Sequence, residues 1–188
     1  MTLPPVFPFI GGRPCLNFVA TLGKRHDTPV ERLPDPASLA RWITEAELSA
    51  GPEPVRVTAR DLSDARALRE ALYRVVRAVM AGREPAAADV ERVNEAAARP
   101  DLAPQLGAER WKAAHPARAA LATVARDAVL LVDGPLLERV KECENPECSL
   151  LFLDDSQARR RRWCSMDRCG NLAKIAGYRS RSRAASTP

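Results

Sequence analysis

The sequence predicts a mainly α-helical protein, with a helical N-terminal domain followed by a small C-terminal module built from a short hairpin and a helix. Apolar residues recur at three- and four-residue intervals through most of the N-terminal part, as on the buried face of a helix. Alanine and arginine, both strong helix formers, are abundant, and the 16 prolines divide the chain into separate helices. Four of the five cysteines fall within one short C-terminal segment.

The first two predicted helices follow turns near the N-terminus. The segment GGRPCLNFVATL begins with a Gly-Gly turn, for which a small anion-binding nest is the less favoured interpretation. A helix follows, with apolar positions at Cys15, Leu16, Phe18, Val19 and Leu22. The next helix begins near Asp35 or Pro36, which suit its first positions, and its apolar face comprises Leu39, Trp42 and Ile43.

The clearest helix is predicted in TARDLSDARALREALYRVVRAVMAG, where Thr58 suits an N-cap and Gly82 a C-terminal stop. A shorter partner helix is expected within residues 85–100. Residues 101–113 lack a helical period and are expected to form a small hairpin or an irregular connection. A last long helix is predicted over 115–134, with one face made of Leu121, Val124, Ala128 and Leu131.

Two cysteine pairs share one internal spacing, Cys143-x4-Cys148 and Cys164-x4-Cys169, and fifteen residues separate the pairs. Two such pairs supply the four soft ligands of tetrahedral Zn²⁺ when two turns fold over one ion. Four thiolates leave no position for water, so we expect one structural zinc ion. Buried free thiols or two disulfides remain as alternatives, and redox catalysis is disfavoured because no C-x-x-C motif occurs.

These patterns divide the chain into a helical domain (1–135), a zinc-finger module (136–180) and a basic tail (181–188) that we expect to be disordered. Within the module, LLFLDDS predicts a strand and turn and NLAKIAGYRS a helix, which together describe a treble-clef-like zinc finger with four cysteine ligands. A module of about 45 residues rarely folds without support, so zinc is expected to hold it together. The fifth cysteine, Cys15, is interpreted as a small core residue.

The basic character of the protein is concentrated at its C-terminal end. Residues 156–188 carry nine Lys or Arg and one acid, a net charge of +8, whereas the rest of the chain has a net charge of −3. A basic end on a mildly acidic body favours a polyanionic partner, with DNA as the first candidate. The candidate nucleic-acid-binding residues are Arg159, Arg160, Arg161, Arg162, Lys174, Arg179 and Arg181.

Four consecutive arginines cannot share one face of a helix or strand. At least one is therefore expected to pack in the finger or to pair with Asp154 or Asp155. A solvated face without a partner is the alternative interpretation of the run. Trp163, which precedes the third cysteine, is interpreted as cover for the zinc core rather than as a base-stacking platform.

The segment RRWCSMDRCGN, followed by AKIAGYRSR, resembles the CGNR-type zinc finger. GGRPCLNFVATL and LPDPASLARWITEAEL resemble the ABATE domain that typically precedes that finger, so the resemblance covers nearly the whole chain. It implies a stress-induced transcription regulator whose finger binds DNA through its positive charge. The chain departs from the family at Leu172, which stands where the finger has its name-giving arginine, so any contact of that arginine is absent here.

The sequence contains no serine-hydrolase, P-loop or zinc-protease motif, and neither His26 nor His115 lies in a ligand-spaced pair. We therefore assign no catalytic residue and expect no enzyme activity. His115 is interpreted as a surface or capping residue and His26 as a loop residue. If the helical domain holds a small-molecule pocket, the candidates to line it are Arg13, Asn17 and Arg41.

The favoured function is a DNA-binding regulator whose helical domain senses a small-molecule effector or binds a protein partner. The alternative is a protein- or RNA-interaction module in which the zinc site is purely structural. The segment MTLPPVFPFIGG lacks the charged start and long apolar run of an export signal, and no stretch reaches about 18 apolar residues. We expect a cytoplasmic protein without membrane association, and a homodimer remains open.

Overall fold

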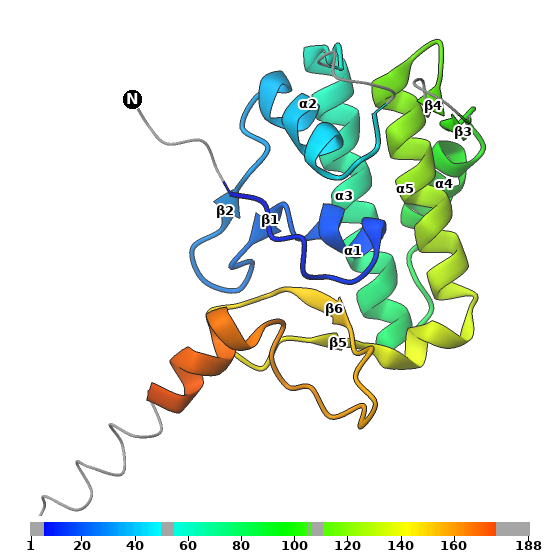
Figure 1. Cartoon of the computed structure of the whole chain (residues 1–188). Helices are drawn as coiled ribbons and strands as arrows, with labels where there is room; N and C mark the ends of the chain where they lie inside the picture. The colour runs from blue at the N-terminus through cyan, green and yellow to red at the C-terminus, as the bar shows by residue number, and fades with distance from the viewer. Residues whose placement is uncertain (1–5, 50–54, 105, 107–110, 176–188) are drawn as a thin grey trace, which may run out of the picture.

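The computed structural model describes residues 6–49, 55–104, 106 and 111–175, and it shows a helical body with a small finger at one end (Figure 1). The body contains α1 (Pro14–Val19), α2 (Pro36–Glu45), α3 (Ala59–Met80), α4 (Ala87–Ala97) and α5 (Pro116–Val132). Each of the other three helices packs against both α3 and α5, which therefore form its centre. The mainly helical fold is confirmed, and no described helix is long and apolar enough to cross a membrane.

Local side-chain chemistry sets the ends of the main helices. Thr58 Oγ1 accepts a hydrogen bond from the backbone N–H of Asp61 (3.1 Å), and the Asp61 carboxylate accepts one from the N–H of Thr58 (3.0 Å). This reciprocal capping starts α3 where the sequence predicts it. The helix stops before Gly82, whose φ of 65° is the left-handed conformation that favours glycine. Asp35 and Ser38 cap α2 in the same reciprocal way.

Three short antiparallel hairpins connect or extend the helices. They pair β1 (Leu22–Gly23) with β2 (Val30–Glu31), β3 (Ala103–Pro104) with β4 (Trp111–Lys112), and β5 (Val140–Glu142) with β6 (Leu151–Leu153). The second hairpin confirms that option for residues 101–113, of which 105 and 107–110 lie outside the described residues.

The first helix is shorter than the predicted apolar pattern. It ends at Val19, and Leu22 begins β1 instead of continuing the helix. Thr21 explains the change, because its Oγ1 donates to the carbonyl of Phe18 (2.7 Å) while its own carbonyl accepts from the N–H of Arg32 (2.9 Å). The last turn of the helix is thereby closed and the chain is directed into the β1–β2 hairpin.

The main hydrophobic core lies between the helices and is centred on aromatic residues. Trp42 and Phe18 are completely buried, with ring centroids 4.9 Å apart. Cys15 belongs to the same core, which confirms its interpretation as a core residue, and burial raises the pKa of its thiol. The apolar residues predicted on the faces of α2, α3 and α5 supply most of the remainder.

A buried ion network ties α3 to the segment that precedes α2. The Arg69 side chain is 3% exposed and bonds both oxygens of Glu31 (2.7 Å each) and one oxygen of Glu70 (2.8 Å). Arg25 adds a second contact to Glu70 at 2.6 Å. Burial alone would raise the pKa of Glu31, but the hydrogen bonds from Arg69 and from the backbone of Leu33 hold it below its ordinary value.

The finger is seated directly on this body. The backbone N–H of Leu153 in β6 donates to the carbonyl of Gly11 (2.9 Å). Gly12 follows with a φ of 79°, and a Cβ there would lie 3.2 Å from the Leu153 Cβ, so glycine permits this close approach. Val140 and Leu151 of the hairpin belong to the main core. The division of the chain at residue 135 stays a prediction. Residues on both sides of that position pack in the same core.

Candidate metal centre and basic loop

The four C-terminal cysteine sulfurs come together in one cluster, all within 4.8 Å of one another. Cys164 Sγ lies 3.9 Å from Cys148 Sγ and 3.6 Å from Cys169 Sγ. A tetrahedron with zinc–sulfur bonds of about 2.3 Å has sulfurs about 3.8 Å apart, so these separations fit one ion. All five cysteines of the chain are free, which excludes the two-disulfide alternative.

Thiolates this close to one another repel unless a cation lies between them. Hydrogen bonds from Cys148 and Cys164 lower the pKa of Cys143 to about 2, and the same interaction with Cys143 raises the pKa of Cys164 far above its ordinary value. One sulfur becomes a thiolate only while its neighbours keep their protons. Zn²⁺ replaces those protons with one central charge. Cys143, Cys148, Cys164 and Cys169 therefore form a structural zinc site, as predicted.

The backbone and a small apolar cluster hold this site in place. The N–H of Cys143 donates to the carbonyl of Leu150 (2.9 Å), which closes the first knuckle, and the N–H of Cys164 points at Cys143 Sγ (3.4 Å). Phe152 is completely buried against the cysteines, and Trp163 packs half-buried on the same cluster. Trp163 thus covers the zinc core, as its position in the sequence suggested.

The second cysteine pair lies at the start of a helical segment. A π-helical turn, η2 (Met166–Gly170), contains Cys169, and residues 171–175 continue as helix. The helical segment therefore starts within the second pair, at Met166, in agreement with the prediction of a helix that starts at this pair. Residues 176–180 of the predicted helix lie outside the described residues. The finger thus has the predicted order of knuckle, hairpin and helix.

A buried carboxylate organises the loop between the hairpin and Cys164. Asp154 is completely buried and accepts hydrogen bonds from Lys141 Nζ (2.6 Å), Ser156 Oγ (2.6 Å) and the N–H of Arg161 (2.9 Å). Burial alone would raise the pKa of Asp154, but Lys141 and Ser156 hold it well below its ordinary value. The Lys141 ammonium also donates to the carbonyl of Arg159 (2.8 Å). This Lys141–Asp154 pair fixes both ends of the loop.

The first two arginines of the run lie at the surface of this loop. Arg159 and Arg160 are exposed, and within the described part of the chain neither guanidinium has an acidic partner. The backbone of Arg159 is left-handed, with φ of 50°, which costs free energy for any residue but glycine. The contacts of Lys141 and Asp154 offset that cost. The two side chains therefore extend from a turn that the protein holds in one conformation.

The other two arginines are used within the finger. Arg161 donates to the carbonyl of Cys164 (2.7 Å) and to the Asp155 carboxylate (3.0 Å), and its guanidinium lies over the ring of Phe152. Arg162 pairs with Glu144 at 2.6 Å. The expectation that part of the run packs or pairs inside the finger is confirmed. A role of Arg161 or Arg162 in nucleic-acid binding stays a prediction, and each already forms an ion pair within the finger.

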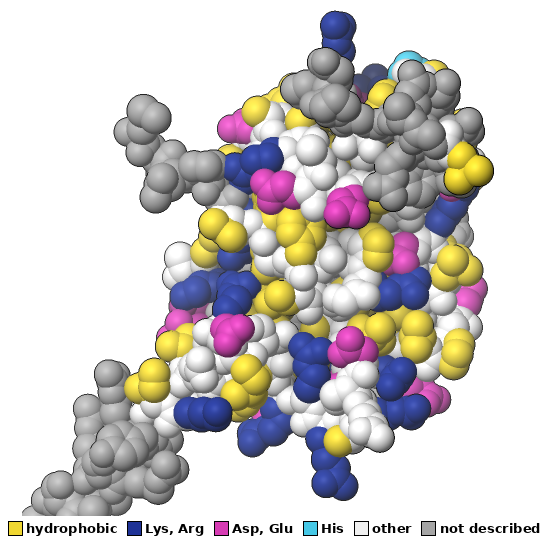
Figure 2. Space-filling model, in the orientation of Figure 1, with side chains coloured by type: hydrophobic (Ala, Val, Ile, Leu, Met, Phe, Trp, Pro, Cys, Tyr) yellow, Lys and Arg dark blue, Asp and Glu magenta, His cyan; other side chains and the backbone are white. Residues whose placement is uncertain are grey.

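The remaining basic candidates are divided between described and undescribed residues. Lys174 is exposed on the helix after η2, beside the exposed Leu172 that replaces the family arginine. Arg179 and Arg181 lie outside the described residues. Arg168, which the sequence did not single out, is also exposed on η2. Figure 2 shows Lys and Arg side chains around the end of the molecule that carries the finger, with acidic groups among them.

The three residues predicted to line a pocket have structural partners. Arg13 pairs with Asp127 of α5, and Asn17 Oδ1 accepts from the N–H of Gly11 (2.8 Å). Arg41 pairs with Glu45 at 3.2 Å and lies over a phenyl ring. None of the three lines the large cavity of the body, whose lining is described below. Their assignment to a pocket stays a prediction.

Two contacts that bear on the site have weak sequence signals. The DDS segment is typical of a turn in which an aspartate accepts backbone hydrogen bonds, and this signal pointed to Asp154 but not to its pairing with Lys141. His26, interpreted as a loop residue, lies against the finger, where its Nε2 is 2.8 Å from Glu142 Oε1. Arg77 at the end of α3 pairs with the same carboxylate. The contacts of His26 and Arg77 with Glu142 join segments more than sixty residues apart, whereas Lys141 and Asp154 are thirteen residues apart.

Comparison with protein families agrees with this architecture. Residues 12–135 match the ABATE family, described as "putative stress-induced transcription regulator", and residues 139–182 match the CGNR zinc finger. The two matches follow the order read from the motifs and together cover the body and the finger. A comparison with curated proteins gives no match.

Proposed function

Because the chain belongs to the ABATE family and ends in a CGNR zinc finger, we propose that it is a DNA-binding transcription regulator. In this proposal the finger docks on DNA phosphates, and the helical body senses a small molecule or binds a protein partner. The protein acts by binding rather than by catalysis, and it acts in the cytoplasm. Zinc has a structural role only.

The observation that carries the proposal is the pair Arg159 and Arg160. Both are exposed, both lack an acidic partner in the described part of the chain, and both extend from a loop held by Lys141 and Asp154. Arginine presents a planar fork of donors that suits phosphate oxygens. A rigid loop presents these forks with little loss of conformational entropy on binding. Arg168 and Lys174 extend the positive charge along the adjoining helix.

Replacing Arg159 and Arg160 tests the proposal directly. The double variant Arg159→Ala/Arg160→Ala should bind a labelled duplex at least about tenfold more weakly, because two phosphate contacts are lost. Fluorescence anisotropy at constant salt measures the effect. The matched control is Arg56→Ala/Arg83→Ala, which removes the same charge from exposed positions on the body and should leave affinity nearly unchanged.

The same titrations should include single-stranded DNA and RNA of equal length. Preferential binding of duplex DNA supports the proposal. Equal affinity of the arginine variant and the native chain for duplex, or no measurable binding of duplex at low salt, contradicts it. A preference for RNA that depends on Arg159 and Arg160 would instead identify an RNA-interaction module.

A further inference from the structure

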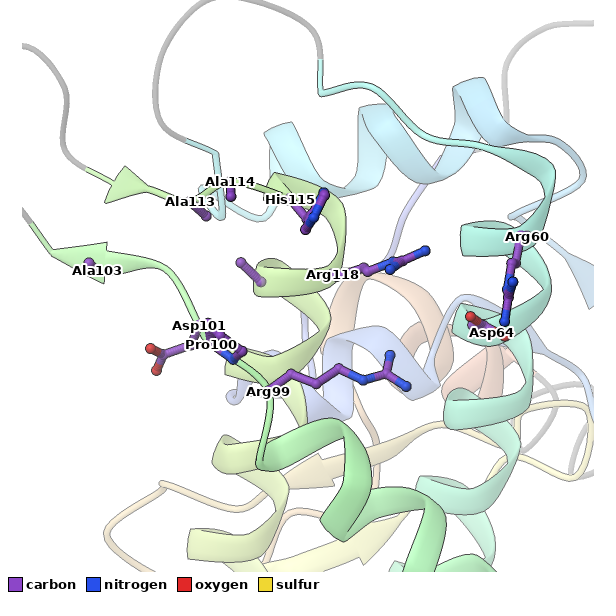
Figure 3. A pocket seen from close by; sticks show the side chains of 11 residues that line it. Arg60, Asp64, Arg99, Pro100, Asp101, Ala103, Ala113, Ala114, His115 and Arg118 are labelled. Atoms are coloured by element: carbon purple, nitrogen blue, oxygen red, sulfur yellow. The ribbon is translucent and has the colours of Figure 1, made fainter.

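A cavity of about 640 Å³ opens at the end of the body opposite the finger, between the first turns of α3 and α5 (Figures 1 and 3). The first turn of α3, the segment after α4 and the start of α5 supply its lining. Its volume lies in the range of pockets that hold small organic molecules. The lining residues include neither the zinc ligands nor Arg159 and Arg160, so this is a separate site.

Three guanidinium groups from three different elements line the cavity. Arg60 comes from α3, Arg99 from the segment after α4, and Arg118 from α5; Figure 3 shows the side chains of Arg99 and Arg118 extending toward the α3 side, where Arg60 and Asp64 lie. Within the described residues neither Arg60 nor Arg99 has an ion-pair partner. Arg118 Nε donates to Asp61 Oδ1 (3.1 Å), and the other oxygen of the same carboxylate caps α3.

The acidic groups of the lining do not neutralise these arginines. Asp101 is already paired with Arg126, which leaves Asp64 as the one lining carboxylate without an ion-pair partner among the described residues. A small adjoining hollow adds Arg92 and Glu95, one charge of each sign. The cavity therefore keeps an excess of positive charge in a partly enclosed space, where opposite charges interact more strongly than in open water.

The helix ends add to this positive potential. Arg60 and Arg118 lie in the first turns of α3 and α5, where the helix dipole is already positive and a basic side chain is unfavourable. In α3 the carboxylate of Asp61 offsets part of this charge. The N-cap of α5, His115, makes no side-chain capping hydrogen bond, and the first turn of α5 contains no acid. An anion beside the start of α5 would relieve the repulsion there and could accept hydrogen bonds from Arg60 and Arg99.

Apart from the imidazole of His115, the rest of the described lining is apolar and small. Pro100, Ala103, Ala113, Ala114 and Ala119 leave space that no large side chain of the described residues fills. A bare inorganic anion would leave most of this volume and its apolar surface unused. The chemistry fits a small molecule with an anionic head for the arginines and a compact apolar body for the alanine-rich wall.

We infer that this cavity binds a small organic anion, with a carboxylate or phosphate head held by Arg60, Arg99 and Arg118 and an apolar body held by the alanine-rich wall. This inference deepens the sensing role in the proposed function. Its test measures ligand binding in the absence of DNA. A negative result would therefore not contradict the DNA-binding proposal, and a failure to bind DNA would not contradict ligand binding in the cavity.

Isothermal titration calorimetry on the full zinc-loaded chain provides the first test. The probes are benzoate, phenyl phosphate, benzyl alcohol and inorganic phosphate. At least one aromatic anion should bind, and the two aromatic anions distinguish a carboxylate head from a phosphate head. Benzyl alcohol, which lacks the charge, and inorganic phosphate, which lacks the apolar body, should bind at least about tenfold more weakly than the better aromatic anion.

Substitutions at three lining residues, with one control outside the cavity, locate the binding. Arg60→Gln and Arg99→Gln should each lower the affinity for the better aromatic anion by about tenfold. Arg83→Gln, at an exposed position outside the cavity, should leave that affinity unchanged. Asp64→Asn removes a repelling carboxylate and should tighten binding by about threefold. A misfolded variant cannot produce that gain.

The inference is overturned by any of three results. They are no binding of either aromatic anion at millimolar concentration, equal affinity for benzyl alcohol and the better anion, and an Asp64→Asn variant that binds more weakly than the native chain. Unchanged affinity in both arginine variants would also overturn it, because binding would then lie elsewhere.

Discussion

The body and the finger are stabilised by different means. The body buries a continuous apolar core around Trp42 and Phe18 and adds an ion network around Arg69. The finger buries five of its own residues in a second cluster, of which three are zinc ligands, together with Ala20 of the body. Apolar burial alone is sufficient to stabilise the body but not to stabilise the finger. The finger therefore depends on its metal, on the Lys141–Asp154 pair and on its seat against the body.

This difference also separates two kinds of positive charge. In the body, Arg69 and Arg25 are buried and paired with Glu31 and Glu70, so they hold segments together. In the finger, Arg161 and Arg162 do similar work, while Arg159 and Arg160 remain exposed on a fixed loop. Arginine content alone does not indicate a binding surface. The proposed surface consists of those arginines that the fold supports but does not use in ion pairs among the described residues.

The largest expected effect is loss of the metal. Metal analysis should find about one zinc per chain, and Cys148→Ser should release it, removing a binding free energy on the order of 10 kcal/mol from the finger. Hydrogen exchange should then rise across residues 140–175, while the helices of the body keep their protection.

The matched control is Cys15→Ala, at the cysteine that lies in the core of the body. This variant should keep its zinc and lose only body stability. Full zinc retention by Cys148→Ser, or an iron–sulfur chromophore in the native chain, would contradict the zinc assignment.

The second expected effect compares Trp42 in the main core with Trp163 on the finger cluster. Trp42→Ala leaves a cavity in the main core and should lower the free energy of unfolding of the body by about 3–5 kcal/mol, with zinc retained. Trp163→Ala should change that value much less, because Trp163 is half-buried on the finger cluster. Denaturant unfolding followed by circular dichroism measures both. A larger effect at Trp163 would mean that the finger stabilises the body.

The third effect is a pH dependence specific to the body. Contacts with Arg69 lower the pKa of Glu31 in the folded state, so its stabilisation is complete above the ordinary glutamate pKa of about 4.3 and is lost as the pH falls through the lower folded value. Glu31→Gln should therefore reduce the loss of stability between pH 7 and pH 3, measured by urea unfolding. The exposed Glu84→Gln should leave that loss unchanged. An identical pH profile for Glu31→Gln and the native chain would argue against the network.

The smallest effect compares neighbours in the arginine run. Arg161→Ala should destabilise the finger by about 1 kcal/mol, because it removes the bonds to the Cys164 carbonyl and to Asp155. Arg160→Ala should change stability by less than about 0.5 kcal/mol. Hydrogen exchange of the finger measures both, and equal effects would show that the two side chains are equivalent.

Local signals predicted the parts of the fold that depend on local chemistry. The Thr58 cap and the Gly82 stop of α3 involve residues within a few positions of each other, and the four zinc ligands are two pairs at short spacing. The order of hairpin and helix in the finger followed from the same short segments. These features are readable because the interactions that cause them join near neighbours in the chain.

The parts that escaped prediction depend on distant contacts. Pairing between Lys141 and Asp154 needs the register of β5 against β6, and the cavity needs the first turns of α3 and α5 to meet. The pairing of Arg13 with Asp127, 114 residues further along the chain, likewise has no local signal. Residue type shows which partners are chemically suitable, whereas the fold determines which partner is within reach.

The salt dependence of duplex binding tests the central claim most directly. The affinity of the native chain should fall steeply as salt rises, and the logarithmic slope should become shallower by about 1.8 in Arg159→Ala/Arg160→Ala, since each phosphate contact contributes about 0.9. The Arg56→Ala/Arg83→Ala control should keep the native slope. A native slope retained in the Arg159→Ala/Arg160→Ala variant would contradict the claim that the zinc-held loop presents these two arginines to phosphates.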